Sequence, residues 1–142
     1  MPSPLDSIIT KFAGADRETR LQLLLHYARK LPALPARYQE ARDRGENQVH
    51  ECQSPVFLFT EVEEGRARLY ADAPHESPTV RGFVSLLGTV MEDVRPADVA
   101  AIPDDLLDRL RLTEILGMNR MQGLTAVLGR VKRMVKEQAS SE

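Results

Sequence analysis

The sequence has few sulfur and aromatic groups and no excess of positive charge. It contains one cysteine, no tryptophan and only 5% aromatic residues, and its net charge is -2. A single cysteine excludes an internal disulfide and a four-cysteine metal site. The small negative charge argues against a protein that binds nucleic acid through phosphate contacts, because such proteins usually carry a basic stripe.

Long hydrophobic runs and targeting segments are also missing. No apolar run approaches the length of a membrane span. The first residues, Met1 to Asp6, lack the basic and apolar regions of a secretory signal. A lone cysteine without a targeting segment fits a reducing compartment. We therefore expect a cytoplasmic protein that binds neither membrane nor nucleic acid.

What is present is typical of a globular domain. Hydrophobic residues make up 42% of the 142 residues and charged residues 28%. Helical spacing of apolar residues follows a polar cap in three places, after Ser3, Asp16 and Ser77. Pro32 and Pro35 should end the second of these helices, and a short helical turn over 36–41 follows.

The centre of the chain changes to a strand pattern. Val56 to Val62 and Arg66 to Tyr70 flank the turn residues Glu63-Glu64-Gly65, which predicts a β-hairpin. Gln48 and Val49 are expected to begin a third strand, since three strands are more stable than an isolated hairpin.

The C-terminal half is predicted to be helical. Pro96 and Pro103 each look like the first-turn proline of a short helix. Asn119 is expected to cap a last helix that runs to about Lys136, and residues 138–142 are expected to be a disordered tail. The whole pattern predicts an α+β fold, with a small antiparallel sheet of about three strands packed against several helices.

Cys52 is the residue with the most distinctive chemistry. A free cysteine is usually a buried small hydrophobe, but here its neighbours are polar. They are His50, Glu51, Gln53 and Ser54. Pro55 favours an extended conformation at the residue before it. We therefore expect the thiol on a loop rather than in the core.

Two neighbours bear on the reactivity of this thiol. In an extended segment, His50 and Cys52 would share a face, so His50 is a candidate base, although a solvated loop histidine is the simpler interpretation. Glu51 disfavours the thiolate by its negative charge. We therefore predict a cysteine that is not strongly activated in the free protein. His26 and His75 lie far away in sequence, so no metal site is expected.

Several other residues have two interpretations. The simplest interpretation of Arg81 and Arg120 is that they are surface arginines. The alternative hypothesis is that they contact a partner protein. Gly82, Gly88 and Gly123 fall inside helical patterns, where they would permit close packing. Four basic residues toward the end of the last helix would complement its dipole or form a docking patch; they are Arg130, Lys132, Arg133 and Lys136.

The segment around Cys52 resembles the acceptor-cysteine segment of the SufE family, the sulfur-acceptor proteins of iron–sulfur cluster assembly. Val49, then Cys52-Gln53-Ser54, then the apolar run Val56-Phe57-Leu58 match that pattern. The resemblance departs from the family at Glu51, where many members have glycine.

Three further elements carry the same resemblance, in order and at matching spacing, over about residues 5–137. Leu31 to Pro35 resembles the family's Leu-Pro-x-Leu-Pro element, and Thr79 to Phe83 its Val-Arg-Gly helix start. Arg120, Gly123, Leu124 and Ala126 resemble its Arg-x-x-Gly-Leu-x-Ala signature. Met121 and Gln122 replace residues that are more often Arg and Asn.

The resemblance implies a single SufE-like domain over residues 1–142, with a SufE/IscU-like fold. It implies that Cys52 accepts sulfur as a persulfide from a SufS-type cysteine desulfurase, stimulates that enzyme and passes the sulfur to a SufBCD-type scaffold. Pyridoxal phosphate would belong to the desulfurase, and this chain would need no cofactor and no metal. His50, Glu51, Gln53, Ser54, Arg81 and Arg120 become candidate loop or partner contacts.

Five points stay open at this level. The chain would be an accessory protein rather than an independent enzyme, and it would be a monomer or a homodimer. A paralogous desulfurase, as for CsdE-like acceptors, is the alternative partner. A single-cysteine peroxidase or redox sensor would need a low thiol pKa. A pure binding module would not need Cys52 at all.

Overall fold

The structure is a computed structural model that describes residues 3–141. It confirms the α+β fold. Seven α-helices, one 3₁₀ helix and three strands are formed by the described residues, in this order: α1 (Pro4–Ala13), α2 (Arg17–Lys30), α3 (Ala36–Asp43), β1 (Gln48–Val49), β2 (Val56–Glu63), β3 (Arg66–Asp72), α4 (Pro78–Val90), α5 (Pro96–Ala100), α6 (Leu106–Arg109), η1 (Leu112–Glu114) and α7 (Met118–Ser141).

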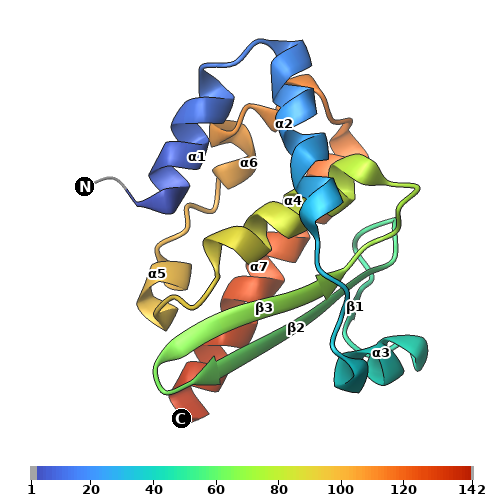
Figure 1. Ribbon diagram of the computed structural model, residues 1–142, viewed down its shortest axis with the longest axis vertical. Coiled ribbons are helices and arrows are strands. Elements are labelled where there is room, and N and C mark those ends of the chain that lie inside the picture. Colours follow the sequence, from blue (N-terminus) through green and yellow to red (C-terminus); the bar gives the residue numbers. More distant parts are fainter. Residues whose placement is uncertain (1–2, 142) are drawn as a thin grey trace.

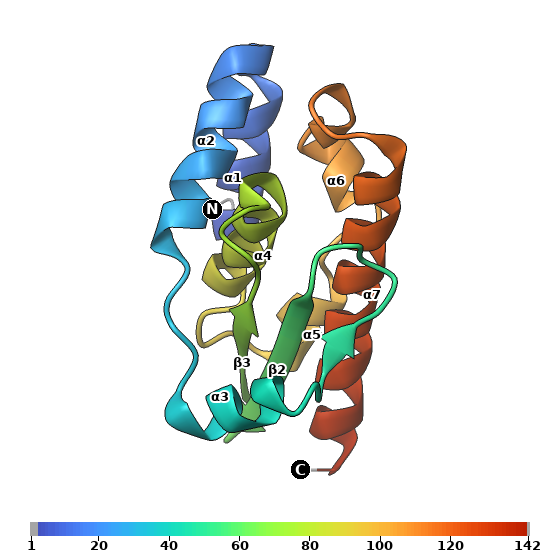
Figure 2. The same cartoon turned by 90° about the vertical axis from the view of Figure 1, so that its right-hand side faces the viewer.

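The three strands form one antiparallel sheet in the order β1-β2-β3. Helices α4 and α7 contact β3 and β2, and α2 packs along α4 (Figure 1). Helix α3 lies on the opposite face, where the ring of Tyr38 stacks on Phe59 with centroids 4.5 Å apart. The view turned by 90° shows the long helix α7 running beside β2 (Figure 2). The sheet is thus covered on both faces.

Local sequence signals account for most element boundaries. Ser3 and Asp6 form a reciprocal capping box at the start of α1. Asp16 caps α2 by accepting a 2.7 Å hydrogen bond from the backbone N–H of Thr19. Glu64 and Gly65 both have positive φ, 51° and 72°, as the two-residue turn of a tight hairpin requires. The predicted hairpin and the third strand are therefore confirmed.

Four local predictions are wrong in whole or in part. Ser77 is the N-cap residue of α4 and Pro78 its first residue, as predicted, but the side chain of Ser77 makes no capping hydrogen bond and is bonded to Ser54 instead. Helix α6 begins at Leu106, three residues after Pro103, whose carbonyl accepts a hydrogen bond from Leu106. Helix α7 begins at Met118, so Asn119 lies inside its first turn rather than at its cap.

The fourth concerns the predicted disordered tail, which is mostly helical. Helix α7 continues past Lys136 to Ser141. The amide of Gln138 both accepts from the hydroxyl of Thr60 (2.5 Å) and donates to its carbonyl (2.8 Å). These two bonds attach the last turns of α7 to the middle of β2. Glu142 lies outside the described residues.

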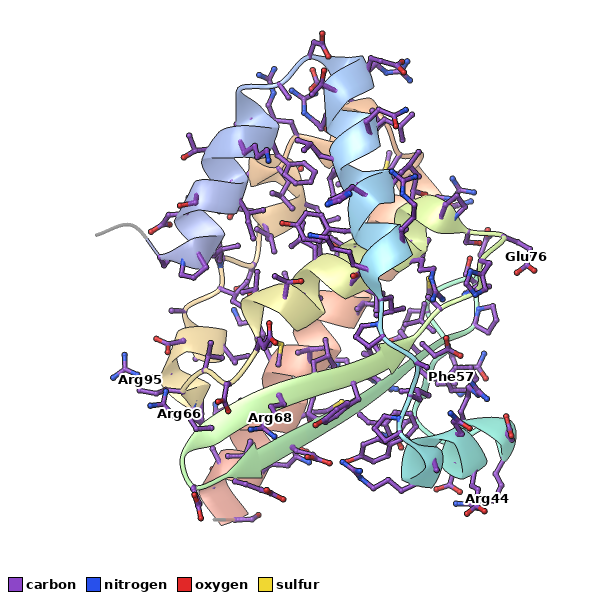
Figure 3. All side chains as sticks on the ribbon, in the orientation of Figure 1. Arg44, Phe57, Arg66, Arg68, Glu76 and Arg95 are labelled. Atoms are coloured by element: carbon purple, nitrogen blue, oxygen red, sulfur yellow. The ribbon has the colours of Figure 1, made fainter. Side chains whose placement is uncertain are left out.

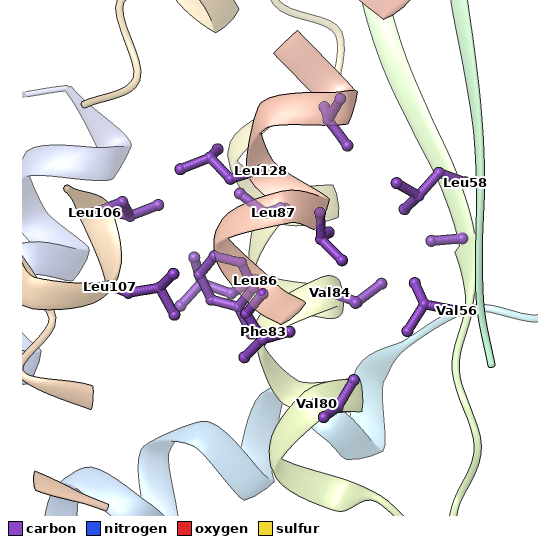
Figure 4. Close-up of a cluster of buried hydrophobic side chains, with 14 of the residues drawn as sticks. Val56, Leu58, Val80, Phe83, Val84, Leu86, Leu87, Leu106, Leu107 and Leu128 are labelled. Carbon is purple, nitrogen blue, oxygen red and sulfur yellow. The ribbon is translucent and has the colours of Figure 1, made fainter. Parts of the chain in front are cut away.

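The core lies between the sheet and helices α4 and α7. Side chains of β2, α4, α6 and α7 meet there (Figure 4), and Phe83, Leu86 and Leu87 of α4 are completely buried. Charged side chains such as Arg44, Arg66 and Arg95 lie at the periphery (Figure 3). No helix among residues 3–141 is both long enough and apolar enough to span a membrane.

Candidate functional site

Cys52 lies in the connection between β1 and β2, over residues 50–55. The prediction of a loop position is confirmed, but the thiol does not project into solvent. Only 7% of Cys52 is exposed, and the residue belongs to the main hydrophobic cluster. The expectation that a polar loop excludes a core environment is therefore wrong. The loop itself is polar, whereas its one thiol is turned inward.

Gly123 of α7 makes this enclosure possible. A Cβ placed on Gly123 would lie 3.1 Å from Cα of Cys52 and 3.3 Å from its Sγ. Such distances are tighter than ordinary carbon contacts, so the helix can approach the loop closely only because position 123 has no side chain. The predicted packing role of Gly123 is confirmed, and its packing partner is the thiol residue.

Two hydrogen bonds hold the loop in this position. The hydroxyl groups of Ser54 and Ser77 are 2.7 Å apart and share a hydrogen bond, which attaches the loop to the start of α4. The backbone N–H of Cys52 donates to the carbonyl of Val49 at 3.4 Å. The loop is thus fixed on one side by α4 and on the other by β1.

Burial governs the reactivity of the thiol. Burial raises the pKa of Cys52, because the charged thiolate is disfavoured away from water. A backbone hydrogen bond from Ser54 and the positive charge of Arg120 lower the pKa in part. The prediction of a thiol that is not activated is confirmed, but the cause is burial rather than the carboxylate of Glu51.

Arg120 is the charged residue that the structure brings to the thiol. It lies three residues before Gly123 on α7, on the side of the helix that faces the loop and the start of α4. Its guanidinium is exposed and makes a long hydrogen bond of 3.5 Å to the hydroxyl of Thr79. This one weak contact leaves donors of Arg120 available for another molecule.

The other polar residues of the loop face outward. His50, Glu51 and Gln53 are all exposed. Over residues 3–141, no hydrogen bond or ion pair joins His50 to Cys52, so the structure gives His50 no role as a base in the closed loop. These three side chains form the outer surface of the loop that covers the thiol.

Arg81 is not a surface arginine, contrary to the simplest interpretation of the sequence. Its side chain is 12% exposed. The guanidinium donates to the carbonyl of Ala28 on α2 (3.2 Å) and to the carbonyl of Ala73 after β3 (2.5 Å). Arg81 therefore connects α4, α2 and the end of β3, and its donors serve the fold.

The basic residues of α7 do not complement the end of the helix. Because α7 continues to Ser141, they lie before its last turn, where the dipole has little effect. Arg130 donates to the carbonyl of Gln48 on β1 (2.9 Å). Lys132 donates to the carbonyl of Ile102 (2.6 Å) and to Asp104 (2.8 Å). These two residues hold α7 against its neighbours.

Sequence reasoning missed Ser77 and Thr79 as parts of the site. Both are polar residues at the start of α4, and the sequence favours a capping role for Ser77 because Pro78 follows it. Only the approach of the β1–β2 loop to α4 shows that these hydroxyls face the loop and Arg120. Within the described part of the chain, no cluster of three His, Cys, Asp or Glu residues could hold a metal ion.

The site therefore contains one enclosed thiol whose pKa is raised, a loop held by two hydrogen bonds, and an exposed arginine beside it. A thiol in this state reacts poorly with reagents in solution, because the thiolate is the nucleophile and access is limited. Displacement of the loop would remove both restrictions. The arrangement suits a cysteine that reacts only after another protein has opened the loop.

Comparisons with known proteins agree over nearly the whole chain. An uncharacterized SufE-like protein from Mycobacterium tuberculosis is 38% identical over 138 residues, which cover 96% of this chain and 94% of that protein. A chloroplastic quinolinate synthase from Nicotiana tabacum is 28% identical over 114 residues, 80% of this chain but only 15% of that protein.

Among solved structures, the solution structure of a hypothetical protein from Thermus thermophilus has a TM-score of 0.82 and 34% identity, with 99% of both chains covered. Residues 6–135 match the family model described as SufE, Fe-S metabolism associated domain. With the enclosed Cys52, Gly123 and Arg120 at the positions that first suggested the resemblance, these matches show that the chain belongs to the SufE family.

Proposed function

We propose that this protein accepts sulfur on Cys52 from a SufS-type cysteine desulfurase and delivers it to a SufBCD-type scaffold in the cytoplasm. One observation supports the proposal most directly. The only thiol of the chain lies on a loop yet is enclosed against Gly123. A carrier of reactive sulfur needs both properties, since it must deliver the sulfur to partners and protect it in transit.

The transfer is a thiol–disulfide exchange in which the transferred group is sulfane sulfur. The Cys52 thiolate attacks the terminal sulfur of the persulfide on the desulfurase. A sulfur–sulfur bond to Cys52 forms as the bond within the donor persulfide breaks. The donor leaves as a thiolate and takes up a proton, so no external oxidant or reductant is needed. The desulfurase is then free for another turnover, which accounts for its stimulation.

Docking of a partner protein has to activate the Cys52 thiol, because the thiol is not activated while the loop is closed. Burial raises the pKa of Cys52 and Arg120 lowers it. When a partner opens the loop, the burial penalty falls while the arginine charge can stay close. The outward-facing residues His50, Glu51 and Gln53 are the first part of the loop that a partner would meet. Pyridoxal phosphate is supplied by the desulfurase in this scheme.

Intact-protein mass spectrometry tests the proposal. Wild type and Cys52→Ser are incubated with a SufS-type desulfurase and free cysteine, with and without reductant. We expect one extra sulfur on wild type alone, removed by reductant, and stimulation of the desulfurase by wild type alone. Circular dichroism checks that Cys52→Ser is folded. A Cys52→Ser protein that stimulates fully would refute the mechanism.

The alternatives give different results in the same experiment. A CsdE-like acceptor would gain sulfur only from a paralogous desulfurase, so both enzymes are supplied in parallel. A peroxidase would oxidise rapidly with hydrogen peroxide and no partner, which the raised pKa and burial of Cys52 disfavour. A binding module would bind its partner without gaining sulfur and would tolerate Cys52→Ser.

A further inference from the structure

Arg20 of α2 is a charged residue in the interior that the proposed function leaves unexplained. Only 2% of it is exposed. Its guanidinium donates to the carbonyls of Phe12 (3.0 Å) and Ala15 (2.5 Å) and to the carboxylate of Glu114. The first two acceptors lie in the turn between α1 and α2, whereas Glu114 lies in η1, far along the chain. Arg20 therefore connects the α1–α2 turn to η1.

Stability alone does not explain a buried guanidinium of this kind. Taking charges out of water costs about as much as their pairing returns, so apolar residues of similar volume would stabilise the fold equally well. A buried charge without its partners is strongly disfavoured, and the guanidinium is satisfied only when each acceptor is in its place. The pair of Arg20 and Glu114 therefore specifies one position of η1 relative to α2.

Two further arginines hold Glu114 in the same position. Arg17, one turn before Arg20 on α2, donates to the backbone carbonyl of Glu114 at 2.9 Å. Arg111 forms an ion pair with the carboxylate at 3.4 Å. Its φ of 59° is left-handed, which is costly for a residue with a side chain and persists where the surrounding contacts determine it. The position of Glu114 is thus determined from several directions.

Glu114 directly precedes the helix that carries the sulfur site. It is the last residue of η1, and α7 begins four residues later at Met118. The connection is hydrogen-bonded, since the backbone N–H of Leu116 donates to the carbonyl of Leu112 at 2.9 Å. Figure 2 shows this connection, in orange, at the same end of the molecule as α1 and α2. Fixing Glu114 therefore fixes the start of α7.

The first turn of α7 carries Arg120, whose side chain has little support of its own. Within residues 3–141 its one side-chain hydrogen bond is the 3.5 Å contact with the hydroxyl of Thr79. The positive charge of Arg120 lowers the pKa of Cys52 in part, and the effect of a charge falls with distance. A displaced helix start would thus weaken the influence of Arg120 on the thiol.

We propose that the ion pair of Arg20 and Glu114, together with Arg17, positions the start of α7 for sulfur acceptance. By fixing that start, these positioning residues hold the guanidinium of Arg120 beside Cys52. They act through Arg120 and not on the thiol directly. The inference rests on the proposed function, and it assigns a part in that function to a segment at the far end of α2.

A double-mutant cycle tests the coupling. The rate at which iodoacetamide alkylates Cys52 is measured against pH in wild type and Arg120→Ala, and again with Glu114→Ala added to both. Arg120→Ala should raise the midpoint in the wild-type background. With Glu114→Ala present, we expect this upward shift to fall to about half or less, because the two residues act through one arrangement. Glu114→Gln keeps an oxygen acceptor for Arg20 and should restore most of the shift.

Arg17→Ala provides a second variant that does not disturb a buried charge, because Arg17 is exposed and Arg20 keeps its acceptors. It should also reduce the shift caused by Arg120→Ala. Arg29→Ala is the matched control, since Arg29 is an exposed arginine near the other end of α2, and it should leave the shift unchanged. Circular dichroism checks the fold of each variant. No shift in the wild-type background, or the same shift in every background, would overturn the proposal.

Sulfur uptake separates this proposal from the proposed function. Mass spectrometry with a cysteine desulfurase and free cysteine should show uptake on Cys52 several-fold slower in Glu114→Ala than in wild type, with most of the rate recovered in Glu114→Gln. Wild type that takes up no sulfur, although the cycle shows coupling, would refute the proposed function alone. Measurable and equal uptake by wild type and folded Glu114→Ala would overturn the positioning role.

Discussion

Gly123 and Cys52 are in direct contact across the interface between α7 and the β1–β2 loop, and the absence of a side chain on Gly123 leaves the space that the thiol occupies. The contact joins two residues that are far apart in sequence. It makes the shelter of the thiol depend on how closely a helix approaches a loop. A side chain added to the helix at this point should therefore change the exposure of the thiol.

Gly123→Ala should push the cysteine loop outward. The added methyl group would lie 3.1 Å from Cα of Cys52, and overpacking of this kind typically costs about 1–3 kcal/mol. We expect native-state alkylation of Cys52 by iodoacetamide to become several-fold faster. Gly129→Ala is the control, because its Cβ would meet only the flexible end of Arg133. Equal alkylation rates in the two variants would contradict the sheltering role.

Ser77→Ala should loosen the loop without shortening α4. The hydroxyl of Ser77 bonds to Ser54 and does not cap the helix, so its loss should cost about 0.5–1.5 kcal/mol. Alkylation of Cys52 should accelerate while far-UV circular dichroism stays unchanged. Ser54→Ala should give the same result, and the double variant should add little. Fully additive effects would show that the two hydroxyls act separately.

The alkylation rate of Cys52 should depend on pH with a midpoint above that of an ordinary thiol, because burial raises the pKa. Arg120→Ala removes a charge that lowers this pKa, so the midpoint should rise further, and Arg120→Lys should keep most of the effect. Identical profiles for wild type and Arg120→Ala would remove Arg120 from the electrostatics of the thiol.

The raised pKa of Cys52 also predicts a change in stability. Since the folded state holds the thiol proton more tightly than the unfolded state, the free energy of unfolding should fall as pH rises from the unfolded pKa through the folded pKa. Cys52→Ser should lack this component. Urea titrations at several pH values above neutrality measure it, and parallel curves for the two proteins would contradict the prediction.

Arg81→Ala should destabilise the fold rather than weaken partner binding alone. It removes two hydrogen bonds and leaves the carbonyls of Ala28 and Ala73 unpaired in a largely buried place, a loss of about 2–4 kcal/mol for the pair of bonds. Arg109→Ala is the control, because it breaks only an exposed ion pair with Asp105, and such pairs contribute little to stability. Urea unfolding of both variants tests the difference, and equal midpoints would contradict the structural role of Arg81.

The sequence alone was sufficient to predict the elements whose signals lie within a few neighbouring residues. Capping residues, the period of apolar side chains and the Glu64-Gly65 turn each depend on a few neighbouring residues, and they located α1, α2, the hairpin and the loop that carries Cys52. The order and spacing of short motifs along the chain were also enough to indicate the family.

Only the tertiary structure determined how those elements contact one another. Gly88 and Gly123 look alike in sequence, yet a side chain at Gly88 would enter open space while one at Gly123 would meet Cys52. Ser77 looks like a cap but bonds to the loop, and Arg81 looks exposed but is enclosed. The physical reason is the same in each case. These environments are created by segments distant in sequence, whose approach no local pattern records.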